Sequence, residues 1–292
     1  MSRSISTSGP HLSFREKWQM GSGEMVLRYL FLLLMLLISV GPFVWQVSTS
    51  FKGPADDIYA YPPSFIPADF TTENYAQVMR TIPVINYAWH SLVVAGTMVI
   101  TNVLFATLAG YAFGALRWRG KGILMALVLS TLLLPAEVTL TSQYLTIKSL
   151  GFADSLVGVI LPGAIGAINV LLMTAAAAAI PPSILEAARI DGANTWQRIR
   201  HVVWPNVRGM ASVVGLMSFI QGWDDFLWPL VVLSDPEKYT LTVGMQYLQS
   251  NFGSDPRIVA AGTVIALVPI IILFAAMQKQ FFKGVESGGV KG

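Results

Sequence analysis

The sequence predicts an all-α membrane protein with six transmembrane helices and both termini on the cytoplasmic side. This prediction rests on the composition, the spacing of uncharged segments and the placement of lysine and arginine. The chain has 292 residues, of which 54% are hydrophobic and only 12% charged, and its mean hydropathy is +0.59. Soluble domains carry about 25% charged residues. The composition therefore favours an integral membrane protein.

Six segments are apolar over enough length to cross about 30 Å of hydrocarbon. They lie at about 25–47, 87–116, 123–144, 156–179, 207–233 and 258–278. Because the centre of a bilayer offers no water, backbone groups must pair within each segment, and each segment is therefore predicted to be a helix. A membrane β-barrel would need short strands of alternating polarity, which the sequence lacks.

The first of these segments has the properties of a retained helix rather than a cleaved signal. Its apolar run is about 23 residues long, whereas the apolar part of a signal peptide has about 7–15 residues. Its one charged residue is Arg28, near the end, where the side chain can reach the membrane surface. Gly41 and Pro42 follow instead of a small-residue cleavage site.

The distribution of basic residues predicts the orientation in the membrane. An even number of spans places both termini on the same side, and cytoplasmic connections carry the excess of lysine and arginine. One side would carry 14 basic residues and the other the remaining 5, which are Lys52, Arg80, Lys148, Lys238 and Arg257. Both termini and the connection at 181–208 are therefore predicted to be cytoplasmic.

These segments divide the chain into three parts. We expect a cytoplasmic tail at 1–24, a six-helix transmembrane domain at 25–281 and a cytoplasmic C-terminal tail at 282–292. Two connections lie outside. The connection at 52–86 contains five prolines and five aromatic residues, which favours a packed cap over the membrane. The connection at 235–257 is rich in Ser, Asp, Pro, Gly and Asn, which indicates a loop.

The cytoplasmic connection at 181–208 contains two predicted short helices. Ser183 and Glu186 have the spacing of a capping box, so a helix is expected over 184–191, with Gly192 ending it. Asn194 or Thr195 can cap a second helix that continues to about 203, and Pro205 marks where that helix bends or ends. The segment is either a simple connector or a surface on which another protein docks.

The spacing within this connection resembles the signature E-A-A-x-x-x-G-x9-I-x-L-P of permease subunits of ATP-binding-cassette importers. Val202 takes the isoleucine position and Trp204 the leucine position. In that family the segment is a coupling helix that docks into a cleft on the ATPase. The resemblance thereby assigns ATPase coupling to a set of residues that comprises Glu186, Ala187, Ala188, Asp191, Gly192 and Pro205.

Two further segments, 180–193 and 222–229, and the tail at 288–292 are similar to the carbohydrate branch of these permeases, the group of the smaller maltose permease subunit. The resemblance implies the type I importer fold and a bacterial inner membrane location. It also implies three partners, namely a second permease subunit, a homodimeric ATPase that holds the ATP and Mg, and an extracytoplasmic solute-binding protein. The solute would be a sugar or related polyol, with glycerol-3-phosphate or glycerophosphodiesters as the alternative.

By the same similarity, the connection at 235–257 would contact the solute-binding protein. The residues expected there are Gln249, Asn251 and Ser254.

Three acidic residues fall inside predicted spans, where ionisable groups usually have a function. Counted from the cytoplasmic ends at 1.5 Å per residue, Glu137 lies roughly 21 Å up, and Asp224 and Asp225 roughly 26 Å up. They would form a polar wall of a translocation path. The alternative is that Glu137 and Asp225 reach water at the outer end or pair with the second permease. Asp224 stands where the family usually has Asn.

Prolines and tryptophans accompany these acids. Pro135 and Pro229 are expected to break the helices at that depth, as at the borders of transport cavities. Trp223 or Trp228 would stack on a sugar ring, although Trp228 would equally suit the aromatic belt at the membrane interface.

Several functions are not supported by the sequence. There are no cysteines, no P-loop for ATP, and no ligand spacing among His11, His90 and His201. We therefore expect no catalytic residue, no metal and no cofactor on this chain, and no nucleic-acid partner at a net charge of +3. Two other classes stay open: an ion-coupled secondary transporter that uses the three acids, and a membrane scaffold that does not transport.

Overall fold

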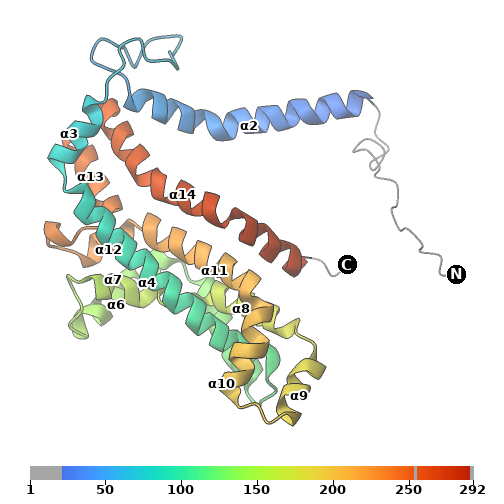
Figure 1. The fold of residues 1–292 in the computed structure, drawn as a ribbon. Helices are drawn as coiled ribbons and strands as arrows, with labels where there is room; N and C mark the ends of the chain where they lie inside the picture. Colours follow the sequence, from blue (N-terminus) through green and yellow to red (C-terminus); the bar gives the residue numbers. More distant parts are fainter. Residues whose placement is uncertain (1–21, 253–254, 290–292) are drawn as a thin grey trace.

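The computed structural model describes residues 22–252 and 255–289, and within these ranges the chain is helical. One isolated antiparallel bridge joins Lys52 to Phe70. Figure 1 shows α9 and α10 at one end of the molecule, and α3 with the connection before it at the opposite end. The prediction of an all-α fold is confirmed for the part of the chain that the structure describes.

The described helices differ widely in length and are separated by short turns and connections. Their bounds are α2 (Ser22–Ser50), α3 (Glu73–Thr81), α4 (Val84–Gly110), α5 (Lys121–Ser130), α6 (Ala136–Ser149), α7 (Leu156–Gly163), α8 (Ala167–Ala178), α9 (Pro182–Ile190), α10 (Thr195–Arg198), α11 (Trp204–Asp224), α12 (Leu227–Val232), α13 (Leu241–Phe252) and α14 (Pro256–Gly289). A π turn at Tyr111–Ala115 follows α4, another at Ile199–Val203 joins α10 to α11, and 3-10 turns occupy Thr131–Leu133 and Pro236–Lys238.

The centre of the molecule is formed by α11, which packs against α4, α8 and α14. Helices α4 and α8 approach closely because glycine faces the contact. A Cβ on Gly110 would lie 2.7 Å from the backbone of Met173, and one on Gly114 would lie 2.6 Å from the carbonyl oxygen of Thr174. In lipid, such small residues let helices gain contact where apolar burial alone gives little advantage.

Three helical stretches are long and apolar enough to cross a membrane, at Gly23–Ser50, Val84–Ala115 and Pro256–Gln278. Two bent pairs raise this number to five if each pair forms one span: Lys121–Leu133 with Ala136–Ser149, at 107°, and Leu156–Gly163 with Ala167–Ala178, at 45°. The predicted third and fourth spans are therefore broken rather than continuous. The third breaks at Pro135, which directly precedes α6 and has no N–H to continue the preceding helix.

The predicted fifth span is also divided. Helix α11 ends at Asp224, the backbone of Asp225 is extended, and α12 starts at Leu227. Polar residues at both ends of α11, including Asn206, Arg208 and Gln221, reduce its apolar length. The count of six spans and the cytoplasmic position of both termini stay predictions.

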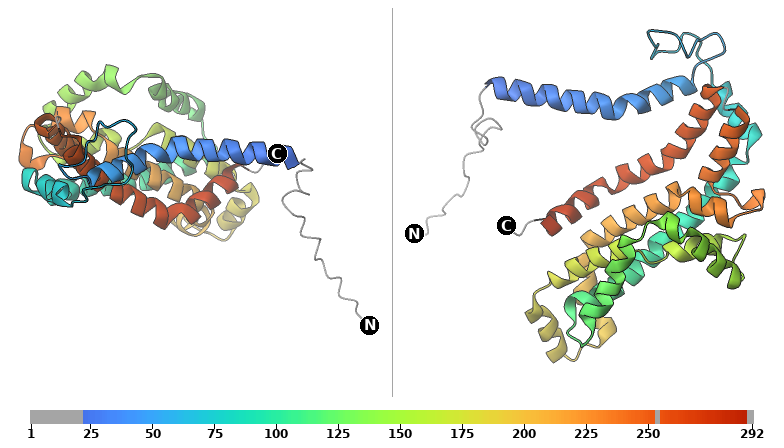
Figure 2. Two further views of the ribbon diagram at one scale, coloured as in Figure 1. Left: turned by 90° about the horizontal axis from the view of Figure 1, so that it is seen from above. Right: turned by 180° about the vertical axis from the view of Figure 1, so that it is seen from behind.

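Helix α2 lies apart from the body over most of its length and contacts α14 (Figures 1 and 2). Its apolar side chains are exposed on every side, as at Leu27, Phe31 and Leu37. A helix that is apolar all round suits a lipid or protein environment rather than water.

The connection at 52–86 is partly packed, as predicted, whereas its place over the membrane stays a prediction. Phe65 meets Trp45 edge-on, and Phe51 contacts both Phe70 and Tyr75. Lys52 is fully buried, its Nζ donates to the Ser64 carbonyl at 2.6 Å, and the same atom lies 4.2 Å from the centre of the Trp45 ring. Four aromatic residues of the connection are nonetheless exposed, namely Tyr59, Tyr61, Phe65 and Phe70.

The prediction of a loop at 235–257 is wrong, because this region contains α13. Leu241 and Leu248 are buried on one face of that helix, and Gly244 lies against the ring of Tyr87 on α4. Packing against α4 and α14 stabilises this helix despite the loop-forming residues around it.

Asp154 joins two connections between helices that are far apart in sequence. Its Oδ1 accepts the N–H groups of Ser234 and Asp235 at 2.9 and 3.0 Å, and its Oδ2 accepts a hydrogen bond from Lys238 Nζ at 2.6 Å. The bond from Lys238, followed by the two backbone bonds, lowers the pKa of Asp154 to about 2. The same bond raises the pKa of Lys238.

This arrangement predicts a pH-dependent contribution to stability. Because the folded-state pKa of Asp154 is lowered, its contribution is complete above the ordinary value of 3.8 and is lost as pH falls from there toward about 2. Asp154→Asn keeps tolerance for the positive φ of 54° but removes the charge. We expect a melting temperature about 2–4 °C below that of the wild type at pH 7, measured in detergent.

The difference in melting temperature between the wild type and Asp154→Asn should shrink as pH falls below 4. Glu237→Gln, which changes an exposed acid in the same connection that forms no ion pair with a described residue, serves as the matched control. A difference for Asp154→Asn that stays constant down to pH 3 would contradict a stabilising role for the Asp154 charge.

Candidate functional site

The chemically distinctive residues form two regions, a helical elbow made by α9 and α10 and a cavity beside α6, α11 and α12. The elbow, with the turn between its helices, holds the residues that the sequence assigned to coupling, except Pro205, which lies in α11. The cavity holds the acids assigned to the solute path.

Helix α9 begins earlier than expected, at Pro182, and ends at Ile190. Proline is favourable at the first helical position because its missing N–H needs no partner there. Ser183 therefore lies inside the helix, no side chain caps its start, and the predicted capping box between Ser183 and Glu186 is wrong. Gly192 has a φ of +75° and turns the chain after α9, as predicted.

The capping box occurs instead at the start of α10. Asn194 Oδ1 accepts the N–H of Gln197 at 2.9 Å, and Gln197 Oε1 accepts the N–H of Asn194 at 2.8 Å. Helix α10 then continues through the π turn into α11, so Pro205 neither ends nor interrupts the helix. It lies in the first turn of α11, where the wider turn before it accommodates the missing N–H.

The elbow is fixed on one side and open on the other. Leu185 and Ile199 pack on a buried cluster that includes Val203 and Val207. Glu186 and Ala187 are exposed, and so are the large side chains of Ile190, at 86%, and Trp196, at 60%. Ala188 is half-buried, and Asp191, Gly192 and Pro205 are exposed. The exposed residues form a surface of small, acidic and apolar side chains.

A cavity of about 650 Å³ lies behind this elbow. Four basic residues line it together with Glu186: Arg117, Lys121, Arg189 and Arg198. None of these five forms an ion pair with another residue that the structure describes. The side of the elbow that faces this cavity therefore carries a net positive charge.

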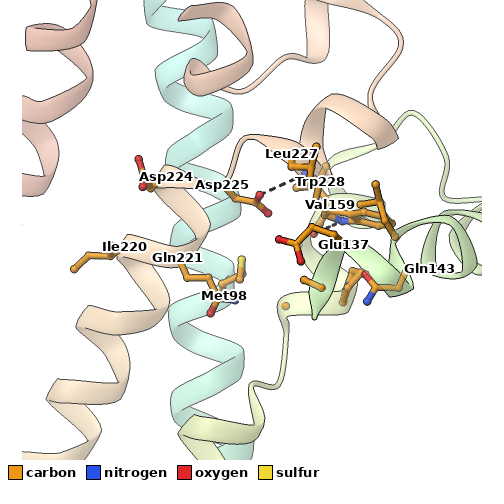
Figure 3. Close-up of a pocket in the computed structure, with 14 residues that line it drawn as sticks. Met98, Glu137, Gln143, Val159, Ile220, Gln221, Asp224, Asp225, Leu227 and Trp228 are labelled. Atoms are coloured by element: carbon orange, nitrogen blue, oxygen red, sulfur yellow. Dashed lines mark hydrogen bonds between the residues drawn. The ribbon is translucent and has the colours of Figure 1, made fainter. Parts of the chain in front are cut away.

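The second region is a cavity of about 480 Å³ that contains all three acids of the predicted spans. Figure 3 shows Glu137 and Asp225 on opposite sides of the same space, whereas the Asp224 carboxylate is turned away from both. Gln143, Gln221 and Met98 also line this cavity. The cavity therefore brings Glu137 and Asp225 together, whereas Asp224 lines it with its carboxylate turned away; the role of these acids in a solute path stays a prediction.

Helix breaks place these acids. Glu137 lies in the first turn of α6, directly after the break at Pro135, where the helix dipole favours a negative charge. Asp225 occupies the extended residue after α11, and its Oδ1 accepts the N–H of Trp228 at 3.4 Å. The carbonyl of Asp225 accepts a bond from Thr242 Oγ1 at 2.6 Å.

The two tryptophans have different environments. Trp228 lines the cavity, and its Nε1 donates to the carbonyls of Gly158 and Val159, both at 3.2 Å. Trp223 does not line the cavity. It is buried, stacks on Phe219 and donates to the carbonyl of Ala266 at 3.0 Å. Its expected role in sugar stacking therefore has no support from the geometry.

A buried polar cluster that the sequence did not reveal lies beside this cavity. Asn102 Nδ2 donates to the carbonyls of Met98 and Gly163, and its Oδ1 accepts the N–H of Gly166 and the Nδ2 of Asn169. Asn169 Nδ2 also donates to Ser218 Oγ at 3.1 Å. The signal in the sequence is asparagine within an apolar span, which is costly unless it is hydrogen-bonded.

The residues expected to meet a binding protein lie on or near α13. Gln249 is exposed on that helix. Asn251 belongs to α13 but its side chain, like Ser254, lies outside the described residues. Within residues 22–252 and 255–289, no group of His, Asp and Glu side chains has the arrangement of a metal site.

Comparison with known proteins identifies the family. Residues 25–287 match the family described as binding-protein-dependent transport system inner membrane component. The arabinooligosaccharides transport system permease protein of Halalkalibacterium halodurans is 30% identical, over 78% of this chain and 82% of that protein. The maltodextrin transport system permease protein of Bacillus subtilis is also 30% identical, over 90% and 95%.

A third relative, the sn-glycerol-3-phosphate transport system permease protein of Brucella abortus, is 27% identical, over 88% of this chain and 94% of that protein. Among solved structures, a chain of a bacterial ABC transporter involved in the import of the acidic polysaccharide alginate has a TM-score of 0.78 and 22% identity. The match covers 94% of this chain and 100% of that one.

These matches confirm the resemblance indicated by the segments at 186–192 and 222–229, and the structural match confirms the fold. The chain belongs to the family of binding-protein-dependent transport system inner membrane components.

Proposed function

We propose that this chain is one of two permease subunits of an ATP-driven importer that carries a sugar or related polyol across the bacterial cytoplasmic membrane. The observation that carries this proposal is the elbow of α9 and α10, which presents Glu186 and Ala187 on a surface fixed by Leu185 and Ile199. Relatives named for arabinooligosaccharide and maltodextrin transport support the sugar.

In this proposal, the elbow docks into a cleft of a separate ATPase. The small side chains of Ala187 and Ala188 allow close approach, and the exposed Ile190 supplies apolar contact. Because α10 continues through the π turn into α11, displacement of the elbow acts directly on the central helix. ATP and Mg would be held by the ATPase chains, and this chain would contribute no catalytic residue.

The cavity next to α6, α11 and α12 would form part of the solute path. Glu137, Asp224 and Asp225 supply hydrogen-bond acceptors for sugar hydroxyls, and Trp228 supplies an apolar wall. Solute would arrive from an external binding protein, which would contact α13 near Gln249 and the adjoining residues Asn251 and Ser254.

One alternative solute has a specific observation in its favour, namely the relative named for sn-glycerol-3-phosphate transport. A different class, an ion-coupled transporter that uses the same three acids, makes a separate prediction. It requires transport by this chain alone under a proton or sodium gradient, whereas our proposal requires the ATPase.

Glu186→Ala tests the coupling surface. We expect the chain to insert normally but to retain the ATPase at least about tenfold more weakly, because a lost hydrogen bond to a charged group costs roughly 1.5–3 kcal/mol. The measurement is copurification of the ATPase with the permease pair, together with ATP hydrolysis stimulated by the binding protein in vesicles.

Glu237→Ala is the matched control, because it removes another exposed glutamate outside the elbow, in the 3-10 turn Pro236–Lys238. It should leave the ATPase association intact. Normal association and normal stimulated hydrolysis in Glu186→Ala would remove the coupling assignment.

A pair of substitutions at Gly192 tests whether the turn shape matters. Its φ of +75° strains a β-branched residue but is tolerated by asparagine, and no atom within 4 Å would obstruct a Cβ. Gly192→Val should therefore reduce ATPase association and stimulated hydrolysis several-fold, while Gly192→Asn stays close to wild type. Equal behaviour of the two variants would show that the turn conformation has no part in coupling.

A further inference from the structure

The charged residues that line the cavity of Glu137 and Asp225 are all acidic. Three of its lining residues are acidic: Glu137, Asp224 and Asp225. No Lys, Arg or His is among the described residues that line it. None of the three acids forms an ion pair with another described residue. Within the described part of the chain, the cavity therefore lacks a neighbouring cation that would balance its carboxylates.

The same side chains have unused hydrogen-bonding capacity. In the described structure, the carboxylates of Glu137 and Asp224 and the amide of Gln221 have no hydrogen-bond partner, and Asp225 accepts only the long bond from the N–H of Trp228. Gln143 uses one N–H for Thr139 and keeps its carbonyl oxygen free. The described side chains of the lining thus offer more free acceptors than donors: the carboxylate oxygens and the two amide oxygens accept, and the free N–H groups of Gln143 and Gln221 are the donors.

We propose that this cavity selects solutes by charge, accepting uncharged or cationic sugars that offer hydroxyl or ammonium donors and rejecting anionic ones. The inference rests on the proposed function, because it assumes that solute passes through this cavity. Carboxylates accept hydrogen bonds but cannot donate them. A phosphate or uronate group would find few donors here and would meet like charges in a cleft whose low-dielectric walls strengthen repulsion.

This selection separates the two solute classes that the relatives suggest. A neutral oligosaccharide or polyol presents hydroxyl donors to Glu137, Asp225 and Gln221 at once. A glycerol phosphate presents a dianion at neutral pH to the same groups. The geometry therefore favours the neutral sugar over the phosphorylated alternative.

The absence of cysteine from the chain gives a direct test of the electric field in the cavity. In the assembled importer, Gln221→Cys places one thiol on this chain, at an exposed position on the cavity wall. The probes are two methanethiosulfonates, one with a trimethylammonium group and one with a sulfonate. Their rates are read from the intact mass of this chain, so cysteines of partner chains do not interfere.

We expect the ratio of cationic to anionic labelling rates to exceed that of a free small thiol by about tenfold or more, since charged clefts concentrate counter-ions by at least that factor. Glu137→Gln and Asp225→Asn in the Gln221→Cys background should bring the ratio toward the free-thiol value. Ser250→Cys, exposed on α13 away from the acids, is the control and should match the free thiol.

A ratio at Gln221→Cys equal to that of the free thiol, or unchanged after both acids are neutralised, overturns the inference. So does an anionic solute bound by the importer's own binding protein, identified by mass spectrometry. Neither result affects ATP-driven uptake, and an anionic solute would change only the solute named in the proposed function. If uptake proved independent of the ATPase while the labelling ratio at Gln221→Cys stayed high, the proposed function would be wrong. The inferred negative potential of the cavity would still hold.

Discussion

The fold depends on how broken helices satisfy their backbone groups where no water is available. The break between α7 and α8 leaves a free carbonyl at Gly163 and a free N–H at Gly166, and the side chain of Asn102 bonds both. Asn102 Oδ1 also accepts a hydrogen bond from Asn169 Nδ2 on α8, and the same nitrogen donates to Ser218 Oγ on the central helix α11. In an apolar environment unpaired groups of this kind cost several kcal/mol. One amide side chain thereby permits a bend of 45° within an otherwise apolar stretch.

The other two breaks, at Pro135 and after α11, determine where the carboxylates of Glu137 and Asp225 lie. Ending α11 at Asp224 and starting α6 at Ala136 brings two carboxylates to the same cavity from segments 88 positions apart in sequence, at 137 and 225. The break after α11 is supported by Trp228, whose indole N–H binds the carbonyls of α7, so the positions of the acids depend on contacts among several short helices.

Hydropathy alone located most of the helical regions, because a span must be apolar over a fixed length. It could not reveal the 107° bend at Pro135, since proline is compatible with both a kink and a break, and the surrounding packing decides between them. In the cytoplasmic connection, α9 starts at Pro182, so Ser183 lies inside the helix and cannot cap it, whereas the predicted cap at Asn194 does form at the start of the second helix, α10. Helix α13 was missed because its support comes from Tyr87 and α14, which are distant in sequence. Proximity of Glu137 to Asp225 was foreseen from helical rise, but the burial of Trp223 was not.

The π turn before α11 changes how the chain should be numbered on a helical wheel. Trp204 donates its N–H to Ile199, five residues back, so one residue more than usual fits into that turn. Counting at 3.6 residues per turn from α10 into α11 consequently misplaces every later side chain by roughly 100°. A cross-linking pair or an alignment gap chosen from a regular helical wheel would therefore select residues on the wrong face of α11. A helical wheel that starts again at Trp204 assigns the faces of α11 correctly.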